Sequence, residues 1–124
     1  MTVGREWMID ATGCDPARLR ERGALARVCD RVIDELGLRV VGTGQWHQFP
    51  GPGGWTAMFL LTESHLTLHT YPEFGTATFN LYCCREREPW PWDERLAEML
   101  GAADVRVTSA CRGEPIPANC EAAS

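Results

Sequence analysis

The chain has 124 residues, of which 44% are hydrophobic, a formal net charge of −5, and twelve basic side chains that are all arginine. This length suits one domain with a hydrophobic core, and an acidic chain without a basic stripe argues against a nucleic-acid-binding surface. The absence of lysine excludes a Schiff-base lysine, a lysine that anchors pyridoxal phosphate and the lysine of a phosphate-binding loop.

The first part of the chain predicts a strand followed by a helix. Residues 6–11 are typical of a short strand, and in the Gly-Cys-Asp-Pro turn that follows Asp15 is placed as a helix N-cap with a proline after it. Apolar residues at helical spacing continue this helix to Leu36, and Gly37 suits its C-terminal cap. Gly23 weakens the first half of the helix. The apolar stripe consists of Leu19, Leu25, Val28, Val32, Ile33 and Leu36.

The middle of the chain predicts three strands. Residues 38–49 indicate a strand that is interrupted by two glycines, and the Pro/Gly-rich residues 50–54 predict a loop. A second strand is expected over 55–62. Residues 64–71 alternate between polar and apolar side chains, as expected for a strand buried on one face, and Pro72 ends it.

The last third of the chain predicts a strand, a helix and a final strand. Residues 76–84 alternate, so Cys83 is expected in the core and Cys84 on the polar face. Asp93 is expected to cap a second helix that runs to Leu100, and residues 105–110 predict the last strand. Trp90 and Trp92 are expected to pack against other residues.

This order of elements predicts an α/β (α+β) fold, specifically a two-layer α/β sandwich in which helices cover one face of a largely antiparallel sheet. We expect one domain over residues 1–113 and a disordered tail over 114–124. The longest apolar run, residues 57–61, is too short to span a membrane, and the start of the chain lacks the pattern of a signal peptide. A cytoplasmic protein without membrane contact is therefore expected. Its six cysteines have no CxxC or zinc-type spacing, so we expect free thiols and no metal site.

The densest group of reactive side chains lies within residues 62–75. In this run Ser64 and His69 are candidates for a nucleophile and its base. Residues five apart point to opposite faces of a regular strand, so Ser64 is expected at a turn, just before the strand begins. Taken alone, each of the two residues is more often structural than catalytic.

The same run resembles the self-processing motif of the bacterial and archaeal S-adenosylmethionine decarboxylases, ESHxxxHTWPExG followed by a cysteine. It stands here as Glu63-Ser64-His65, His69-Thr70-Tyr71-Pro72-Glu73 and Gly75, with Cys84 twenty residues beyond Ser64. The resemblance extends to the Gly-Cys-Asp-Pro turn, to Phe49 ahead of the glycine-rich loop, and to Arg112-Gly113.

The resemblance implies an enzyme that carries a pyruvoyl group instead of pyridoxal phosphate. The Ser64 hydroxyl would attack the Glu63 carbonyl, and the resulting ester would eliminate to dehydroalanine, which hydrolyses to the pyruvoyl group and ammonia. The ketone of this group would form a Schiff base with the substrate amine and accept the electrons that decarboxylation releases. The processed fragments would be residues 1–63 and 64–124, and no external cofactor would be needed.

The resemblance also implies roles for residues outside the cleavage point. His69 would be the base that removes the serine α-proton, Thr56 would help the cyclic cleavage intermediate to form, and Cys84 would protonate the substrate carbon. The implied substrate-binding residues are Phe49 and Tyr71, which would stack on the adenine, and Glu73, which would bind the ribose hydroxyls.

Three positions depart from the family motif. Tyr71 stands where tryptophan is usual, Asn80 where aspartate is usual, and Arg85 where glycine is expected. Asn80 removes a negative charge that a sulfonium substrate would favour. Arg85 and Arg87 most simply form a solvated face with Glu86 and Glu88, although Arg85 could approach a substrate carboxylate.

Three functions are compatible with the sequence. The first is decarboxylation of S-adenosylmethionine for polyamine (spermidine) biosynthesis. The second is the same self-cleavage followed by decarboxylation of ornithine or arginine, which the resemblance to relatives of this family also implies. The third is a non-catalytic paralogue that regulates an active subunit. The resemblance also implies a homodimer with its sites at or near the interface, in which Phe49 serves the neighbouring protomer.

Overall fold

The structure is a computed structural model that describes residues 3–85 and 87–114. Six strands form one sheet in the order β2-β3-β4-β5-β1-β6, in which every neighbouring pair is antiparallel. The strands are β1 (Gly4–Thr12), β2 (Gln45–Gln48), β3 (Trp55–Leu61), β4 (Ser64–Tyr71), β5 (Thr76–Cys83) and β6 (Asp104–Arg112). The helices are α1 (Pro16–Leu19), α2 (Arg22–Glu35) and α3 (Trp92–Leu100), and the short 3-10 helix η1 (Pro72–Phe74) follows β4.

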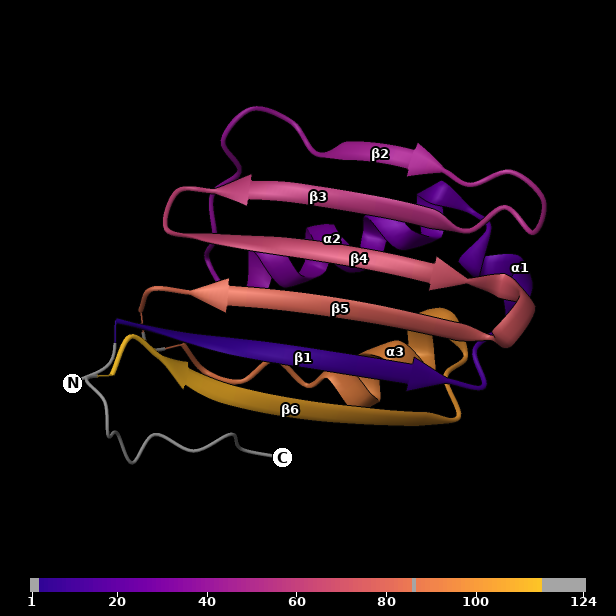
Figure 1. Cartoon of the computed structure of the whole chain (residues 1–124). Helices are drawn as coiled ribbons and strands as arrows, with labels where there is room; N and C mark the ends of the chain where they lie inside the picture. Colours follow the sequence, from indigo (N-terminus) through magenta and orange to yellow (C-terminus); the bar gives the residue numbers. More distant parts are fainter. Residues whose placement is uncertain (1–2, 86, 115–124) are drawn as a thin grey trace.

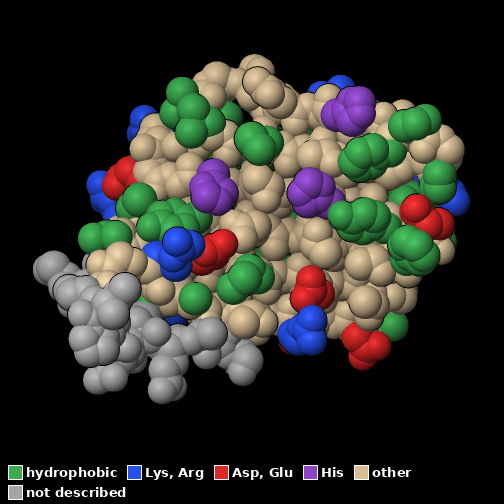
Figure 2. Space-filling model, viewed as in Figure 1, with side chains coloured by type: hydrophobic (Ala, Val, Ile, Leu, Met, Phe, Trp, Pro, Cys, Tyr) green, Lys and Arg blue, Asp and Glu red, His purple; other side chains and the backbone are tan. Residues whose placement is uncertain are grey.

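The helices lie behind the sheet in Figure 1, so the predicted two-layer α/β sandwich is confirmed. The hydrophobic core fills the space between the helices and one face of the sheet, where Leu66, Leu68 and Thr70 of β4 are at most 1% exposed. The opposite face, which we call the open face, carries the alternate residues of the strands and is turned toward the viewer in Figure 2. Histidine side chains lie on it, and its exposed apolar side chains include Met58 (55% exposed) and Leu60 (60%).

The helix predicted after the Gly-Cys-Asp-Pro turn is two helices, which corrects that expectation. Glu21 is extended, with φ −96° and ψ 109°, and separates α1 from α2. The carbonyl oxygens of Leu19 and Arg20 accept hydrogen bonds from the Thr70 hydroxyl and the Trp55 indole, each at 2.9 Å. These carbonyls at the end of α1 are therefore satisfied by side chains of the sheet, and the chain can leave the helix there.

The other helix ends agree more closely with the sequence. Asp15 caps α1 as predicted, since its carboxylate accepts the Ala17 N–H at 3.0 Å. Helix α3 begins earlier than expected, because Pro91 is the N-cap and Asp93 lies in the first turn. A carboxylate in that turn still interacts favourably with the helix dipole.

The strand predicted over residues 38–49 is mostly a loop. Only β2 joins the sheet in full, and Val40 forms an isolated bridge with Leu61. Gly42 has a φ of 76°, which is incompatible with an extended strand. Gly44 lies so close to the ring of Phe59 that a Cβ at this position would be 2.3 Å from it. The two glycines therefore mark a bend and a close approach.

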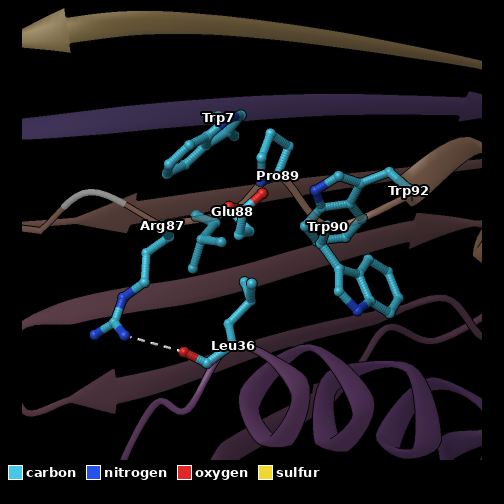
Figure 3. Close-up of a pocket in the computed structure, with 8 residues that line it drawn as sticks. Trp7, Leu36, Arg87, Glu88, Pro89, Trp90 and Trp92 are labelled. Atoms are coloured by element: carbon cyan, nitrogen blue, oxygen red, sulfur yellow. Dashed lines mark hydrogen bonds between the residues drawn. The ribbon is translucent and has the colours of Figure 1, made fainter.

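The tryptophans pack as predicted. Trp90 and Trp92 are buried, with their rings edge to face at a centroid distance of 4.8 Å. Both rings line the small cavity of Figure 3, and the Trp90 indole N–H donates to Glu35 at 2.8 Å.

The cysteines correct one expectation. Cys14, Cys29, Cys83 and Cys84 are free thiols, and burial raises the pKa of Cys29 and Cys83. Cys111 is disulfide-bonded, so the expectation of free thiols is wrong at this residue. Spacing along the chain does not report which cysteines the fold brings together.

Some expectations concern segments that the structure does not describe. The predicted tail over 114–124 lies outside the described residues except for Glu114. Within the described part of the chain, no helix is long and apolar enough to cross a membrane, and no group of three or more His, Cys, Asp or Glu side chains could hold a metal ion.

Candidate active site

The proposed cleavage point lies at the tight connection between β3 and β4. Residues 62–63 form the turn, and β4 has the predicted bounds of 64–71. Ser64 is therefore the first residue of the strand and does not lie in the turn before it, as was expected. Ser64 is paired with Leu61 across the hairpin and with Cys83 of β5. The serine hydroxyl is hydrogen-bonded to the Cys83 thiol, whose pKa burial raises, so this thiol stays protonated.

The peptide bond between Glu63 and Ser64 has a polarised carbonyl. The Cys84 N–H donates a hydrogen bond to the Glu63 carbonyl oxygen at 3.1 Å. Such a bond favours negative charge on that oxygen and so favours nucleophilic attack on the carbonyl carbon. The Cys84 side chain is exposed, as the strand alternation predicted, and directly follows β5. We call Glu63, Ser64 and Cys84 the turn end of the site.

Thr56 and His69 form a hydrogen-bonded pair on the open face. They are directly opposite each other in β3 and β4, and Thr56 Oγ1 lies 3.0 Å from His69 Nδ1. Both side chains are half-buried. The hydrogen bond fixes the orientation of the imidazole, and which of the two groups donates depends on the tautomer of His69.

A cavity of about 190 Å³ lies close to this pair, where β4 ends. Its wall contains all three predicted substrate-binding residues, Phe49, Tyr71 and Glu73. The glycine-rich loop closes over the strand at Gly54, where a Cβ would lie 2.2 Å from the Thr70 carbonyl oxygen. Only glycine permits that approach. We call the loop end the group formed by Phe49, Thr56, His69, Tyr71 and Glu73.

The turn end and the loop end of one chain are far apart. Ser64 and His69 are separated by five residues of a regular strand, which is about 17 Å, and Tyr71 lies about 23 Å from Ser64. The structure therefore places the Thr56–His69 pair and the predicted substrate-binding residues at the same end of the sheet but keeps them away from Ser64. A direct Ser64–His69 nucleophile and base pair within one chain, suggested by their closeness in sequence, is wrong.

Sequence reasoning missed a polar network on the open face. The His65 ring stacks on Tyr82 at a centroid distance of 5.6 Å, and its Nε2 lies 3.2 Å from Asn80 Oδ1. The Asn80 amide donates to Glu6 at 2.7 Å, and Arg112 donates to the same carboxylate at 2.6 Å. These hydrogen bonds, that of Asn80 first, hold the pKa of Glu6 below its usual value. Alternation placed the β4 and β5 side chains of this network on one face but could not predict their partners.

The network bears on the missing aspartate at position 80. Asn80 itself is neutral, but the Glu6 carboxylate lies within hydrogen-bonding distance of its amide. A negative charge is thus present one strand away, in β1, and it is shared with Arg112.

Of the two arginines expected on a solvated face after Cys84, only Arg85 is exposed. Arg85 donates to the side-chain carboxylate of Glu63 at 2.5 Å. Arg87 donates to the backbone carbonyl of Leu36 at 3.1 Å. Arg85 is 67% exposed, so its expected solvated position is confirmed, whereas Arg87 is half-buried and the expectation is wrong for it. Glu86 lies outside the described residues.

Comparison with known proteins places this site in a family. The model of the S-adenosylmethionine decarboxylase family matches residues 5–113. An S-adenosylmethionine decarboxylase proenzyme of Caldicellulosiruptor saccharolyticus is 32% identical over 90% of this chain and 89% of the relative. One of Thermotoga petrophila is 33% identical over 90% and 85%. An arginine decarboxylase proenzyme of Ignicoccus hospitalis is 32% identical over 91% and 79%.

A solved structure shows the same fold. The crystal structure of the adenosylmethionine decarboxylase from Aquifex aeolicus matches with a TM-score of 0.76 over 95% of this chain and 97% of that chain, at 22% identity. The resemblance predicted from the motif is therefore confirmed, and the chain belongs to the S-adenosylmethionine decarboxylase family.

Proposed function

We propose that this protein is a self-processing, pyruvoyl-dependent decarboxylase whose substrate is S-adenosylmethionine, and that its product supplies aminopropyl groups for polyamine synthesis. The cavity at the loop end is the observation that supports S-adenosylmethionine as the substrate. Phe49 and Tyr71 offer aromatic faces to a nucleobase and to a sulfonium cation, and the Glu73 carboxylate can accept hydrogen bonds from ribose hydroxyls.

The turn end fits the formation of a pyruvoyl group from Ser64. The attacking hydroxyl and the Glu63 carbonyl belong to adjacent residues, and the Cys84 N–H already donates to that carbonyl. A pyruvoyl group at position 64 would supply a ketone for the substrate amine and an electron sink for decarboxylation. The exposed thiol of Cys84, next to Ser64's strand partner Cys83, is placed to donate a proton to the substrate carbon.

The working site is proposed to form between two copies of the chain. Neither His69 nor the substrate cavity reaches Ser64 of its own chain, since they lie about 17 Å or more along β4. Two open faces packed about a two-fold axis, with their β4 strands antiparallel, bring the turn end of one protomer to the loop end of its partner. The exposed Met58 and Leu60 of the open face would be buried in such a dimer.

Arginine is the second candidate substrate. The arginine decarboxylase proenzyme of Ignicoccus hospitalis is as similar in sequence as the S-adenosylmethionine decarboxylase relatives. A guanidinium group can also stack on Tyr71 and form an ion pair with Glu73, so the same cavity could hold it.

Release of carbon dioxide from carboxyl-labelled substrates tests the proposal. The processed protein is incubated with S-adenosylmethionine, arginine and ornithine at equal concentrations, with a Ser64→Ala variant as the inactive control. We expect the highest kcat/KM with S-adenosylmethionine. A preference for arginine or ornithine would replace the substrate but keep the enzyme class, whereas no release from any of the three would contradict the function.

A further inference from the structure

A polar cavity of about 240 Å³ lies beside the proposed cleavage point and is separate from the substrate cavity. Glu63 and Ser64 line it, together with three arginines, Arg39, Arg85 and Arg87. Three arginines thus line the cavity together with one acidic residue, Glu63. In a chain with a net charge of −5, this is a local excess of positive charge.

The positions of the three arginines leave hydrogen-bonding capacity in the cavity. Arg85 is bound to the Glu63 side chain. Arg87 lines the cavity and donates to a backbone carbonyl at the end of α2, as Figure 3 shows. Arg39 is tied to the turn by its backbone, whose carbonyl accepts the Thr62 N–H at 2.9 Å, and its guanidinium makes no ion pair with the described part of the chain. Three arginines with one acidic residue among them would stabilise an anion that enters the cavity, because guanidinium groups donate charge-assisted hydrogen bonds.

Self-cleavage would create such an anion at this place. In the ester form, Ser64 Oγ is bonded to the Glu63 carbonyl carbon. When a base removes the Ser64 α-proton, the electron pair of that C–H bond forms a double bond between Cα and Cβ. The bond between Cβ and Oγ breaks, and its electron pair leaves with Oγ as the new α-carboxylate of Glu63. The leaving group of the elimination is therefore a carboxylate in the cavity wall.

We infer that the arginine-lined cavity binds the α-carboxylate that self-cleavage leaves on Glu63, and that its arginines accelerate the cleavage by stabilising this leaving group. Charge-assisted hydrogen bonds from guanidinium to carboxylate are strong, and they act where negative charge develops. The inference rests on the proposed function. It concerns this chain in particular, because Arg85 stands where the family motif has glycine.

A pair of matched variants tests the inference. The double variant Arg39→Gln/Arg85→Gln removes two charges from exposed positions of the cavity, so the fold should be kept, and circular dichroism checks this. Arg27→Gln is the control. Arg27 is 66% exposed and forms an ion pair with Glu21, as Arg85 is 67% exposed and forms one with Glu63. Arg27 lies on α2 and does not line the cavity. Each chain is made by cell-free translation, and mass spectrometry follows the appearance of the fragments 1–63 and 64–124.

A hydroxylamine trap identifies the step that is slowed. Hydroxylamine cleaves an accumulated ester and leaves an intact serine at position 64. We expect cleavage of the double variant to be slower by about 10-fold or more, with a hydroxylamine-sensitive ester accumulating, and Arg27→Gln to match the unaltered chain. Equal cleavage rates of the double variant and the unaltered chain would overturn the inference, and so would slow cleavage without a trapped ester. Normal cleavage with a raised KM would also overturn it, because the cavity would then bind the substrate carboxylate. An unaltered chain that never cleaves is a different result, because it contradicts the proposed function itself.

Discussion

The role of His69 depends on the side chain that faces it across the sheet. Its hydrogen bond with Thr56 follows from the register of β3 and β4, which the turn at residues 62–63 sets. The motif resemblance pointed to both residues, and the structure places them 3.0 Å apart. Their roles in processing stay a prediction that substitutions can test.

Thr56→Val removes the hydroxyl but keeps the shape of the side chain. We expect self-cleavage to slow by about tenfold or more, since His69 loses the partner that orients it. Thr56→Ser keeps the hydroxyl and should cleave at nearly the normal rate. Time courses of fragment formation by mass spectrometry compare the two variants, and equal rates for valine and serine would show that the hydrogen bond has no part in processing.

Single residues also show where sequence reasoning stops. Phe49, Tyr71 and Glu73 could be identified because they belong to a motif and its flanking loop, and the structure brings them into one cavity. Arg39 and Arg87 could not be identified, because they stand far apart in the sequence and meet only where the end of α2 approaches the β3–β4 turn.

At the scale of elements, the junction of α1 with the sheet explains an error in the predicted helix. Thr70 in β4 is buried, and its hydroxyl donates to the Leu19 carbonyl at the end of α1 while accepting the Trp55 N–H from β3, both at 2.9 Å. Hydrophobic periodicity continued through this point, so the sequence predicted one helix. The break depends on side chains of distant strands, which no local pattern contains.

Thr70→Val should therefore destabilise the protein. The substitution leaves a buried N–H and a buried carbonyl without their partner, and we expect a loss of about 2 kcal/mol in the free energy of unfolding. Thr70→Ser keeps both hydrogen bonds and should lose about 1 kcal/mol through the missing methyl group. Urea unfolding in a Ser64→Ala background, at one protein concentration, keeps the chain intact. A valine variant as stable as the serine variant would contradict the role of the hydroxyl.

For the whole molecule, the sequence predicted the sandwich because alternating strands and one long apolar helix stripe are strong signals, and the family is confirmed by the comparisons. The separation of the turn end from the loop end follows from the strand predicted over residues 64–71, because five residues of a strand span about 17 Å. The closeness of residues 64 and 69 in the motif obscures it. In a dimer, the turn end of one chain can lie next to the loop end of the other, so that residues of one motif can form a single site.

Mixing two inactive chains tests the two-copy site. Ser64→Ala lacks the serine, His69→Ala lacks the base, and neither variant should cleave when made alone. When they are co-expressed with different tags, we expect cleavage of the His69→Ala chain only, because its Ser64 meets His69 of the other protomer. If His69 acts within its own chain, the His69→Ala chain stays intact in the mixture.

Self-cleavage between Glu63 and Ser64 is the claim on which the proposed chemistry depends, and intact-mass measurement of the purified protein tests it most directly. We expect two fragments: residues 1–63 ending in a free carboxylate, and residues 64–124 lighter than a serine-terminated fragment by the mass of one ammonia. Borohydride should add two hydrogens to the second fragment, as expected for a ketone. An intact chain of 124 residues with an ordinary serine at position 64 after long incubation would show that the protein does not cleave itself.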